Sequence, residues 1–254
     1  MAEKDAGDSG GQGAPRARTG ISGLDSVLNG GIPKGNVVLL TGACGTGKTT
    51  LALEMLVNGA KDGEAGIFIT TTEPVERVID NAATYAFFDR ALVGKKIHFV
   101  DSADLFEELR ISPDLTDKDI EALLKWVTRT VKDKQAGRLV LDSLTGILQR
   151  ISKPDHIREF TDKLGRTLSG AGVTTICTSE TKPGETSYST FGVEEAVADG
   201  IILLGNHDSR GYLLRTLQVV KMRGTVHSRA RYVMDLTSHG VIMVPMLKAS
   251  MREG

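Results

Sequence analysis

Residues 42–49 read Gly42-Ala43-Cys44-Gly45-Thr46-Gly47-Lys48-Thr49, a complete G-x-x-x-x-G-K-T motif that decides the fold of this chain. An apolar run of strand type at residues 37–40 precedes the motif, and a helical pattern of apolar residues starting at Leu51 follows it. Strand, loop and helix thus come in the order that a phosphate-binding loop requires. The alternative, a glycine-rich turn with an exposed lysine, does not account for this context.

Each residue type in the loop has a physical role. The three glycines let the backbone turn its N–H groups toward phosphates, and the helix that starts near Lys48 adds its positive end. Lys48 is placed to reach the β- and γ-phosphates, and the Thr49 hydroxyl is placed to ligate Mg²⁺ beside them. We therefore predict that residues 42–49, together with Thr50, bind the phosphates of a nucleoside triphosphate.

The composition narrows the class of protein. The chain has 254 residues and a formal net charge of −1, so a broad cationic surface for nucleic acid or anionic lipid is not expected. Its two cysteines, Cys44 and Cys177, lie far apart without a metal-ligand spacing, which argues against a disulfide framework or a zinc site. A reactive thiol at Cys44, in the phosphate loop, stays open as an alternative to simple packing.

Neither a membrane span nor a secretion signal is visible in the sequence. No stretch is long and apolar enough to cross a membrane, and the N-terminus lacks an apolar segment of signal-peptide type, so we expect a cytoplasmic protein. Residues 1–17 are rich in glycine and charge and lack aromatic and branched aliphatic side chains, which predicts a disordered tail. Residues 18–254 are expected to form one domain, because strand and helix signals follow each other without a break.

Hydrophobic periodicity predicts an α/β fold. Strand signals alternate with helix signals up to residue 178 and then give way to consecutive strands. The predicted strands are 36–41, 66–71, 97–100, 138–141, 173–178, 201–204, 212–221, 231–236 and 241–244. The predicted helices follow the phosphate loop and residues 74, 116 and 154. This order indicates a mainly parallel sheet flanked by helices, with antiparallel strands added at the C-terminal edge.

Two of these strands end in acidic residues. The strand 138–141 is closed by Asp142, and an apolar run that ends in aspartate is the Walker B pattern, in which the carboxylate holds the Mg²⁺ shell. The pattern is weak alone, because many buried strands end in aspartate, but it gains weight beside a phosphate loop. The strand 66–71 delivers Thr72 and Glu73 to the edge where open α/β sheets bind ligands.

Beyond the phosphate loop, further segments resemble the KaiC family of RecA-superfamily ATPases. The resemblance runs from Thr19 to Pro245. Its motifs are Thr19-Gly20-Ile21-Ser22-Gly23-Leu24-Asp25, Leu141-Asp142-Ser143, Phe191-Gly192-Val193-Glu194-Glu195 and Lys221-Met222-Arg223-Gly224-Thr225-Val226-His227. The last of them is similar to the K-x-R-G-x-x-H element of that family. The resemblance implies a RecA-like P-loop core.

The resemblance also implies a site shared between subunits. In the family, ATP lies between neighbours in a six-membered ring, and the lysine and arginine of the K-x-R-G-x-x-H element face the neighbour's γ-phosphate. Carried over, Lys221 and Arg223 are trans-acting cations, which suits a transition state that spreads negative charge over the γ-phosphate. The alternative for both is a solvated strand end. Other positions that resemble family contacts to the nucleotide or metal are Thr84, Thr225, His227, Thr237 and Ser238.

Two departures from the family pattern bear on activity. The family commonly carries paired glutamates after the second strand, where this chain has Thr72 and Glu73. One carboxylate suffices to orient or deprotonate the attacking water, so Glu73 is predicted to be catalytic. Hydrolysis is predicted to be slow if the missing second acid contributes to the reaction. The alternative for Glu73 is a surface acid that opens the following helix. In a kinase domain of the family, adjacent serine and threonine residues are phosphorylated. Near the corresponding place, this chain has Glu194-Glu195-Ala196, so autophosphorylation there is not expected.

Three functions are open, and the first is favoured. The chain is predicted to be an ATPase that uses ATP and Mg²⁺ and whose nucleotide state controls a homohexameric ring and, through it, an unidentified protein partner. A nucleotide-binding switch or scaffold with little turnover is the alternative that Thr72 suggests. A DNA-handling ATPase of RecA type shares the core, but the near-neutral charge and the lack of an appended DNA-binding module argue against it.

Overall fold

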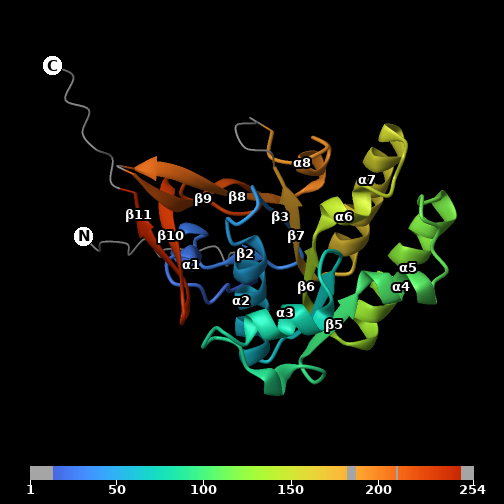
Figure 1. The fold of residues 1–254 in the computed structure, drawn as a ribbon, viewed down its shortest axis with the longest axis horizontal. Helices are drawn as coiled ribbons and strands as arrows, with labels where there is room; N and C mark the ends of the chain where they lie inside the picture. Colours follow the sequence, from blue (N-terminus) through green and yellow to red (C-terminus); the bar gives the residue numbers. More distant parts are fainter. Residues whose placement is uncertain (1–13, 182–186, 210, 247–254) are drawn as a thin grey trace, which may run out of the picture.

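The computed structural model describes residues 14–181, 187–209 and 211–246, and a large sheet runs through them with helices on both faces (Figure 1). Its strands are β3 (Val37–Gly42), β4 (Ala65–Thr70), β5 (Ile97–Asp101), β6 (Ala136–Asp142), β7 (Thr174–Glu180), β8 (Gly200–Ser209), β9 (Tyr212–Met222), β10 (Arg231–Thr237) and β11 (Gly240–Pro245). They lie in the order β11-β10-β9-β8-β3-β7-β6-β4-β5. The predicted α/β class is confirmed.

Strand β3 lies inside the sheet because both of its faces are apolar. All six of its residues are buried, and Val38 and Leu40 face one helical layer while Val37 and Leu39 face the other. β3 pairs in parallel with β7 and β8, and β6 in parallel with β7 and β4, whereas β9, β10 and β11 continue the sheet in antiparallel order. The C-terminal ends of β3, β4, β6 and β7 therefore meet at one edge of the sheet.

The helices form two layers that Figure 1 separates clearly. One face carries α1 (Leu24–Val27), α2 (Lys48–Lys61) and α3 (Val75–Ala82), and the other carries α4 (Ser102–Glu108), α5 (Asp117–Asp133), α6 (Leu144–Leu148) and α7 (Pro154–Gly170). The short helix α8 (Glu194–Val197) packs against α7. Helix α5 begins with the predicted Thr116 cap, which forms a capping box with Asp119. Within the described ranges, none of the helices is long and apolar enough to cross a membrane.

Two short strands pair outside the large sheet. β1 (Arg16–Ala17) runs antiparallel to β2 (Ile32–Pro33), and Arg16 Nη1 donates a hydrogen bond of 3.2 Å to Gly31 O. The last two residues of the tail predicted at 1–17 are thus part of the fold, because their backbone has a partner strand. Residues 1–13 of that tail lie outside the described residues.

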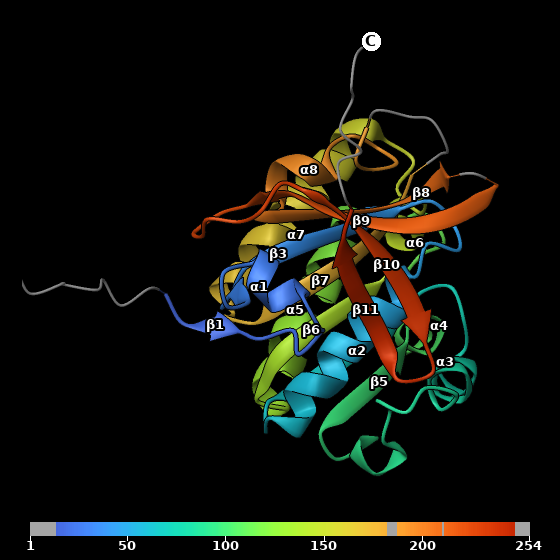
Figure 2. The ribbon, with the colours of Figure 1, turned by 90° about the vertical axis from the view of Figure 1, so that its left-hand side faces the viewer.

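The hairpin formed by β10 and β11 stands beside α2 (Figure 2). Glu54 on α2 accepts a hydrogen bond of 2.7 Å at Oε2 from the Val241 amide on β11. At the start of α2, a Cβ added to Gly47 would lie 3.1 Å from Leu236 Cδ1 on β10. The hairpin therefore covers the side of the phosphate loop that faces away from β7.

Candidate functional site

The motif at residues 42–49 forms a tight loop between the C-terminal end of β3 and the N-terminal end of α2. Gly47 precedes α2 with φ of 96°, a left-handed conformation that other residues rarely adopt. A Cβ on Gly42 would lie 2.5 Å from Leu204 O and 2.9 Å from Thr46 Oγ1, so only glycine fits there. Thr46 Oγ1 closes the loop by donating 2.8 Å to Ala43 O. The local geometry is that of a cradle of backbone groups at a helix N-terminus.

Lys48 folds over this cradle. Its Nζ donates hydrogen bonds of 2.8 Å to Gly42 O and 3.1 Å to Ala43 O. Burial lowers the pKa of Lys48, and the nearby carboxylates of Glu180 and Asp142 oppose that change. The ammonium group thus lies at the loop, among acidic side chains that come from two neighbouring strand ends.

Asp142 is the second element of the predicted site, and the structure brings it to Thr49. Thr49 Oγ1 on α2 donates 2.7 Å to Asp142 Oδ2 at the end of β6. The other carboxylate oxygen, Oδ1, accepts a short hydrogen bond from Thr178 Oγ1 on β7. The side chain is buried, with 7% of its surface exposed. A hydroxyl and a carboxylate oxygen side by side are the hard ligands that Mg²⁺ prefers, so the pair fits that ion.

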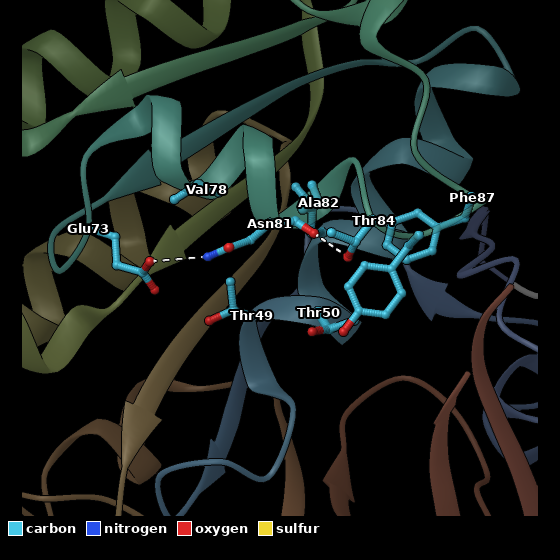
Figure 3. Close-up of a pocket in the computed structure, with 10 residues that line it drawn as sticks. Thr49, Thr50, Glu73, Val78, Asn81, Ala82, Thr84 and Phe87 are labelled. Carbon is cyan, nitrogen blue, oxygen red and sulfur yellow. Dashed lines mark hydrogen bonds between the residues drawn. The ribbon is translucent and has the colours of Figure 1, made fainter. Parts of the chain in front are cut away.

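Glu73 faces the same space as Thr49. Together with Thr50 and Thr84 they line a cavity of about 350 Å³ between α2 and α3 (Figure 3). Glu73 Oε2 accepts a hydrogen bond of 3.4 Å from Asn81 Nδ2 and pairs with Arg77 Nε at 3.3 Å. The carboxylate therefore lies at the rim of the cavity, and both of its partners belong to α3.

Thr237 ends β10, and Ser238 begins the turn that leads to β11. Ser238 O accepts a hydrogen bond of 2.7 Å from Ala86 N, which fixes the turn to the segment that follows Thr84. Because the neighbouring residues Tyr85 and Phe87 line the cavity, this turn adjoins its far end. Thr84, Thr237 and Ser238 thus lie on one side of the phosphate loop.

The K-x-R-G-x-x-H segment lies at the opposite end of the sheet. Met222 at the end of β9 pairs with Gly200, and Gly200 pairs with Val38 near the start of β3. At ~3.3 Å per residue, about 13 Å of strand separates this register from Gly42, and Arg223 follows beyond it. Thr225 Oγ1 contacts Leu28 O at 3.4 Å, and His227 Nδ1 lies 3.3 Å from Ser228 O. One chain does not bring its Lys221, Arg223, Thr225 and His227 to its own phosphate loop.

The structure adds three residues to the site that sequence reasoning missed. Thr178 holds Asp142, Glu180 lies opposite Gly42 in the β3–β7 register, and Arg215 Nε on β9 donates 3.2 Å to Gly45 O. Glu180 could have been predicted from the sequence, since it is an acidic residue at the end of an apolar strand, as Asp142 is. Thr178 and Arg215 lie inside strands and have no local signal, because strand pairing alone carries them to the loop.

The two cysteines differ in environment. Cys177 is buried in β7, and burial raises the pKa of its thiol to about 12, so it behaves as a packing residue. Cys44 is exposed in the phosphate loop. In the described part of the chain, no group of three or more His, Cys, Asp and Glu side chains is arranged to hold a metal ion.

Comparisons with known proteins cover nearly the whole chain. A family model described as "ATPase: KaiC" matches residues 17–248. A UPF0273 protein of Pyrococcus horikoshii is 38% identical over 91% of this chain and 94% of its own length. The circadian clock oscillator protein KaiC of Parathermosynechococcus lividus is 31% identical over 92% of this chain but only 43% of its own length. The crystal structure of a KaiC-like protein from Pyrococcus horikoshii superposes with a TM-score of 0.79 at 35% identity, covering 91% of this chain and all of that one.

Proposed function

The chain belongs to the KaiC family of ATPases, and from this we propose that it binds ATP with Mg²⁺ and hydrolyses it at a site completed by a second copy of the chain. One observation carries the proposal. The hydroxyl of Thr49 and the carboxylate of Asp142 lie 2.7 Å apart at the phosphate loop, and Glu73 faces the same cavity. These are the parts that a phosphoryl-transfer site needs on one subunit.

Each group of residues at the site has its own role in binding ATP and in hydrolysis. Backbone N–H groups and Lys48 hold the phosphates, and Thr49 and Asp142 hold Mg²⁺. When bound, the metal ion supplies positive charge that stabilises the phosphate oxygens. Glu73 orients the attacking water and accepts its proton, because it is the carboxylate at the cavity rim. Thr84, Thr237 and Ser238, at the far end of the cavity, contact the remainder of the nucleotide.

Lys221 and Arg223 act on the ATP of a neighbouring subunit. Lys221 pairs with Ile201, and Ile201 pairs with Leu39, about 10 Å of strand from Gly42; Arg223 lies beyond about 13 Å of strand. The Lys221 ammonium is bound at Ala198 O, so neither cation lies at the phosphate loop of its own chain, which supports this assignment. Thr225 and His227 accompany them at the interface. A contact between opposite ends of the sheet is head-to-tail, and such contacts close into rings when the rotation per subunit allows it. We propose a homohexamer whose nucleotide state regulates a protein partner.

A second candidate is a nucleotide switch with little turnover. It is favoured by the contacts of Glu73, whose carboxylate is engaged by Arg77 and Asn81 rather than free in the cavity. In that case ATP binding alone would set the assembly state. Both candidates share the binding site and differ only in multiple-turnover hydrolysis.

Phosphate release in Mg²⁺ and ATP separates the two candidates. We expect slow multiple turnover in the wild type, loss of activity in Lys48→Ala because phosphate binding fails, and a fall in kcat of about 100-fold in Glu73→Gln with binding retained. Glu121→Gln, at an exposed position on α5, is the matched control. Lys48→Ala activity equal to that of the wild type would refute an ATPase at this loop, and a single slow turnover would favour the switch. Light scattering with and without a slowly hydrolysed ATP analogue tests the assembly.

A further inference from the structure

Both proposed trans cations already have partners within their own chain, and those partners lie in one short segment. Lys221 Nζ donates 2.7 Å to Ala198 O, directly after α8, and 3.5 Å to Glu195 O within α8. Arg223 Nη1 pairs with Asp199 Oδ1 at 3.3 Å. The positions of both cations therefore depend on where residues 195–199 lie.

Hydrogen bonds join residues 195–199 to the loop 188–192, which precedes α8. Glu195 Oε1 accepts hydrogen bonds of 2.7 Å from Tyr188 N and 3.2 Å from Ser189 Oγ. Ser189 is fully buried, and its Oγ also accepts 3.2 Å from Gly192 N. A charged acceptor with two donors is a strong contact, so the carboxylate of Glu195 fixes α8 to residues 188–192.

The loop is in turn tied to the strand next to the phosphate loop. Thr190 Oγ1 donates 2.6 Å to Glu180 O, and Glu180 pairs with Gly42 across β7 and β3. The carboxylate of Glu180 also acts on the Lys48 ammonium electrostatically. A continuous series of contacts thus leads from the phosphate loop through Glu180 and Thr190 to α8.

We infer that Glu195 is a positioning residue for Lys221, and that the link through Thr190 makes the position of Lys221 depend on the nucleotide bound at the chain's own phosphate loop. The inference rests on the proposed function, in which Lys221 serves the neighbour's ATP. In each subunit, the nucleotide bound at the C-terminal end of β3 then changes the position of the Lys221 ammonium, which lies nearer the start of β3. Neighbouring sites in a ring become coupled without direct contact between their nucleotides.

Helix α8 is suited to small movements. It has only four residues, and Glu194 is buried with 2% of its surface exposed. Among the described residues, Glu194 Oε1 has no hydrogen-bond partner. A buried carboxylate oxygen without a donor is unfavourable and opposes the packing of α8 on α7, so the bonds made by Glu195 and Lys221 are needed to hold α8 in the observed position.

Steady-state ATP hydrolysis by the full chain tests the positioning role. In Glu195→Ala we expect kcat to fall about tenfold with the KM for ATP within about twofold, because ATP binding at the phosphate loop is intact. Glu195→Gln should recover most of kcat, since its amide oxygen still accepts the bonds from Tyr188 and Ser189. The decisive variant is Glu195→Ala combined with Lys221→Ala, which should be no slower than Lys221→Ala alone.

The outcomes separate the two claims. If the effect of Glu195→Ala is unchanged in the Lys221→Ala background, or if Glu195→Ala matches its control Glu121→Ala, the positioning role is overturned while the ATPase stands. If Lys221→Ala itself keeps the kcat of the wild type, the trans site of the proposed function fails and the inference fails with it. Loss of ATP binding in Glu195→Ala, measured with a fluorescent ATP analogue, would also overturn the inference.

The coupling is tested by Thr190→Val, which removes the bond to Glu180 O at nearly constant volume. We expect a wild-type Hill coefficient for ATP above 1 that falls to about 1 in the variant, with the affinity for the fluorescent analogue unchanged. Thr128→Val, which removes an exposed hydroxyl on α5, is the matched control. A Hill coefficient of about 1 in the wild type, or an equal coefficient in wild type and Thr190→Val, would overturn the coupling.

Discussion

Glu54 is a buried carboxylate that joins two parts of the fold. It lies on α2 with 6% of its surface exposed, and it holds the Val241 amide of β11 at 2.7 Å. Burial raises the pKa of Glu54, and the Val241 amide and the charge of Lys61 oppose the rise. The raised pKa means that ionised Glu54 is less favourable in the folded chain than in the unfolded one.

We therefore expect Glu54→Gln to gain stability relative to the wild type as pH rises. A carboxyl group with a raised folded pKa favours folding fully below its unfolded pKa and loses that contribution as pH rises through the folded pKa. Glutamine does not titrate and keeps an oxygen for Val241 N. The free energy of unfolding from urea titrations at about pH 4 and about pH 8 measures the difference. Glu121→Gln, at an exposed position, is the control variant. A pH-independent difference between Glu54→Gln and the wild type would contradict this expectation.

At the same scale, the predicted site separates into local and distant parts. The phosphate loop follows from residue order, because strand, loop and helix are consecutive in the chain. Asp142 is predicted from the Walker B pattern at the end of its strand, and it meets Thr49 because β3 and β6 end at the same edge of the sheet. Thr178 and Arg215 could not be found in this way, since their contacts depend on which strands become neighbours. The engagement of Glu73 by Arg77 and Asn81 is likewise a property of the folded α3.

Helix α8 lies in close contact with its neighbour α7. It packs against α7 at Gly165, where an added Cβ would overlap Val197 Cγ1 and lie 3.5 Å from Val197 Cβ. Glycine inside a helix is unfavourable by about 1 kcal/mol relative to alanine, so the position is kept for this close approach rather than for the helix itself.

Gly165→Ala should therefore destabilise the fold by about 1–3 kcal/mol, because the overlap with Val197 outweighs the gain in helix propensity. Gly170→Ala, on the same helix with no atom within 4 Å of the added Cβ, should be neutral or slightly stabilising. Chemical denaturation measures both. Adding Val197→Ala to Gly165→Ala should restore much of the loss, and failure of that rescue would show that the close contact with α8 is not the cause.

The long elements could be predicted and the short ones could not. Helix α5 spans Asp117–Asp133 after the cap predicted at Thr116, because both its apolar face and its capping residue have a signal in the sequence. Helix α8 and strand β1 have four and two residues, too few for a periodic pattern. Their conformation comes from distant partners: the Lys221 ammonium for α8 and strand β2 for β1.

At the scale of the whole molecule, the sheet keeps two sets of polar groups apart. The phosphate loop, Asp142 and Glu73 lie at the C-terminal ends of the parallel strands, and Lys221 and Arg223 lie near the start of β3. The phosphate-binding groups are thus at one end of β3, and the Lys221/Arg223 pair is near the other. In the proposed head-to-tail assembly, the phosphate loop of one copy would meet Lys221 and Arg223 of the next, and the shared site would be incomplete in a single copy.

Mixing two inactive variants tests this arrangement directly. Lys48→Ala subunits keep the trans cations and Lys221→Ala subunits keep the phosphate loop, so each alone should hydrolyse little ATP. In an equal mixture assembled at random, about one quarter of the interfaces combine an intact loop with an intact Lys221, and we expect activity of that order. Mixing Lys48→Ala with the double variant Lys48→Ala/Lys221→Ala should restore nothing, because no loop is intact. If light scattering finds mixed assemblies and activity does not return, Lys221 does not serve a neighbour's nucleotide, since a shared site must be repaired when its halves come from different chains.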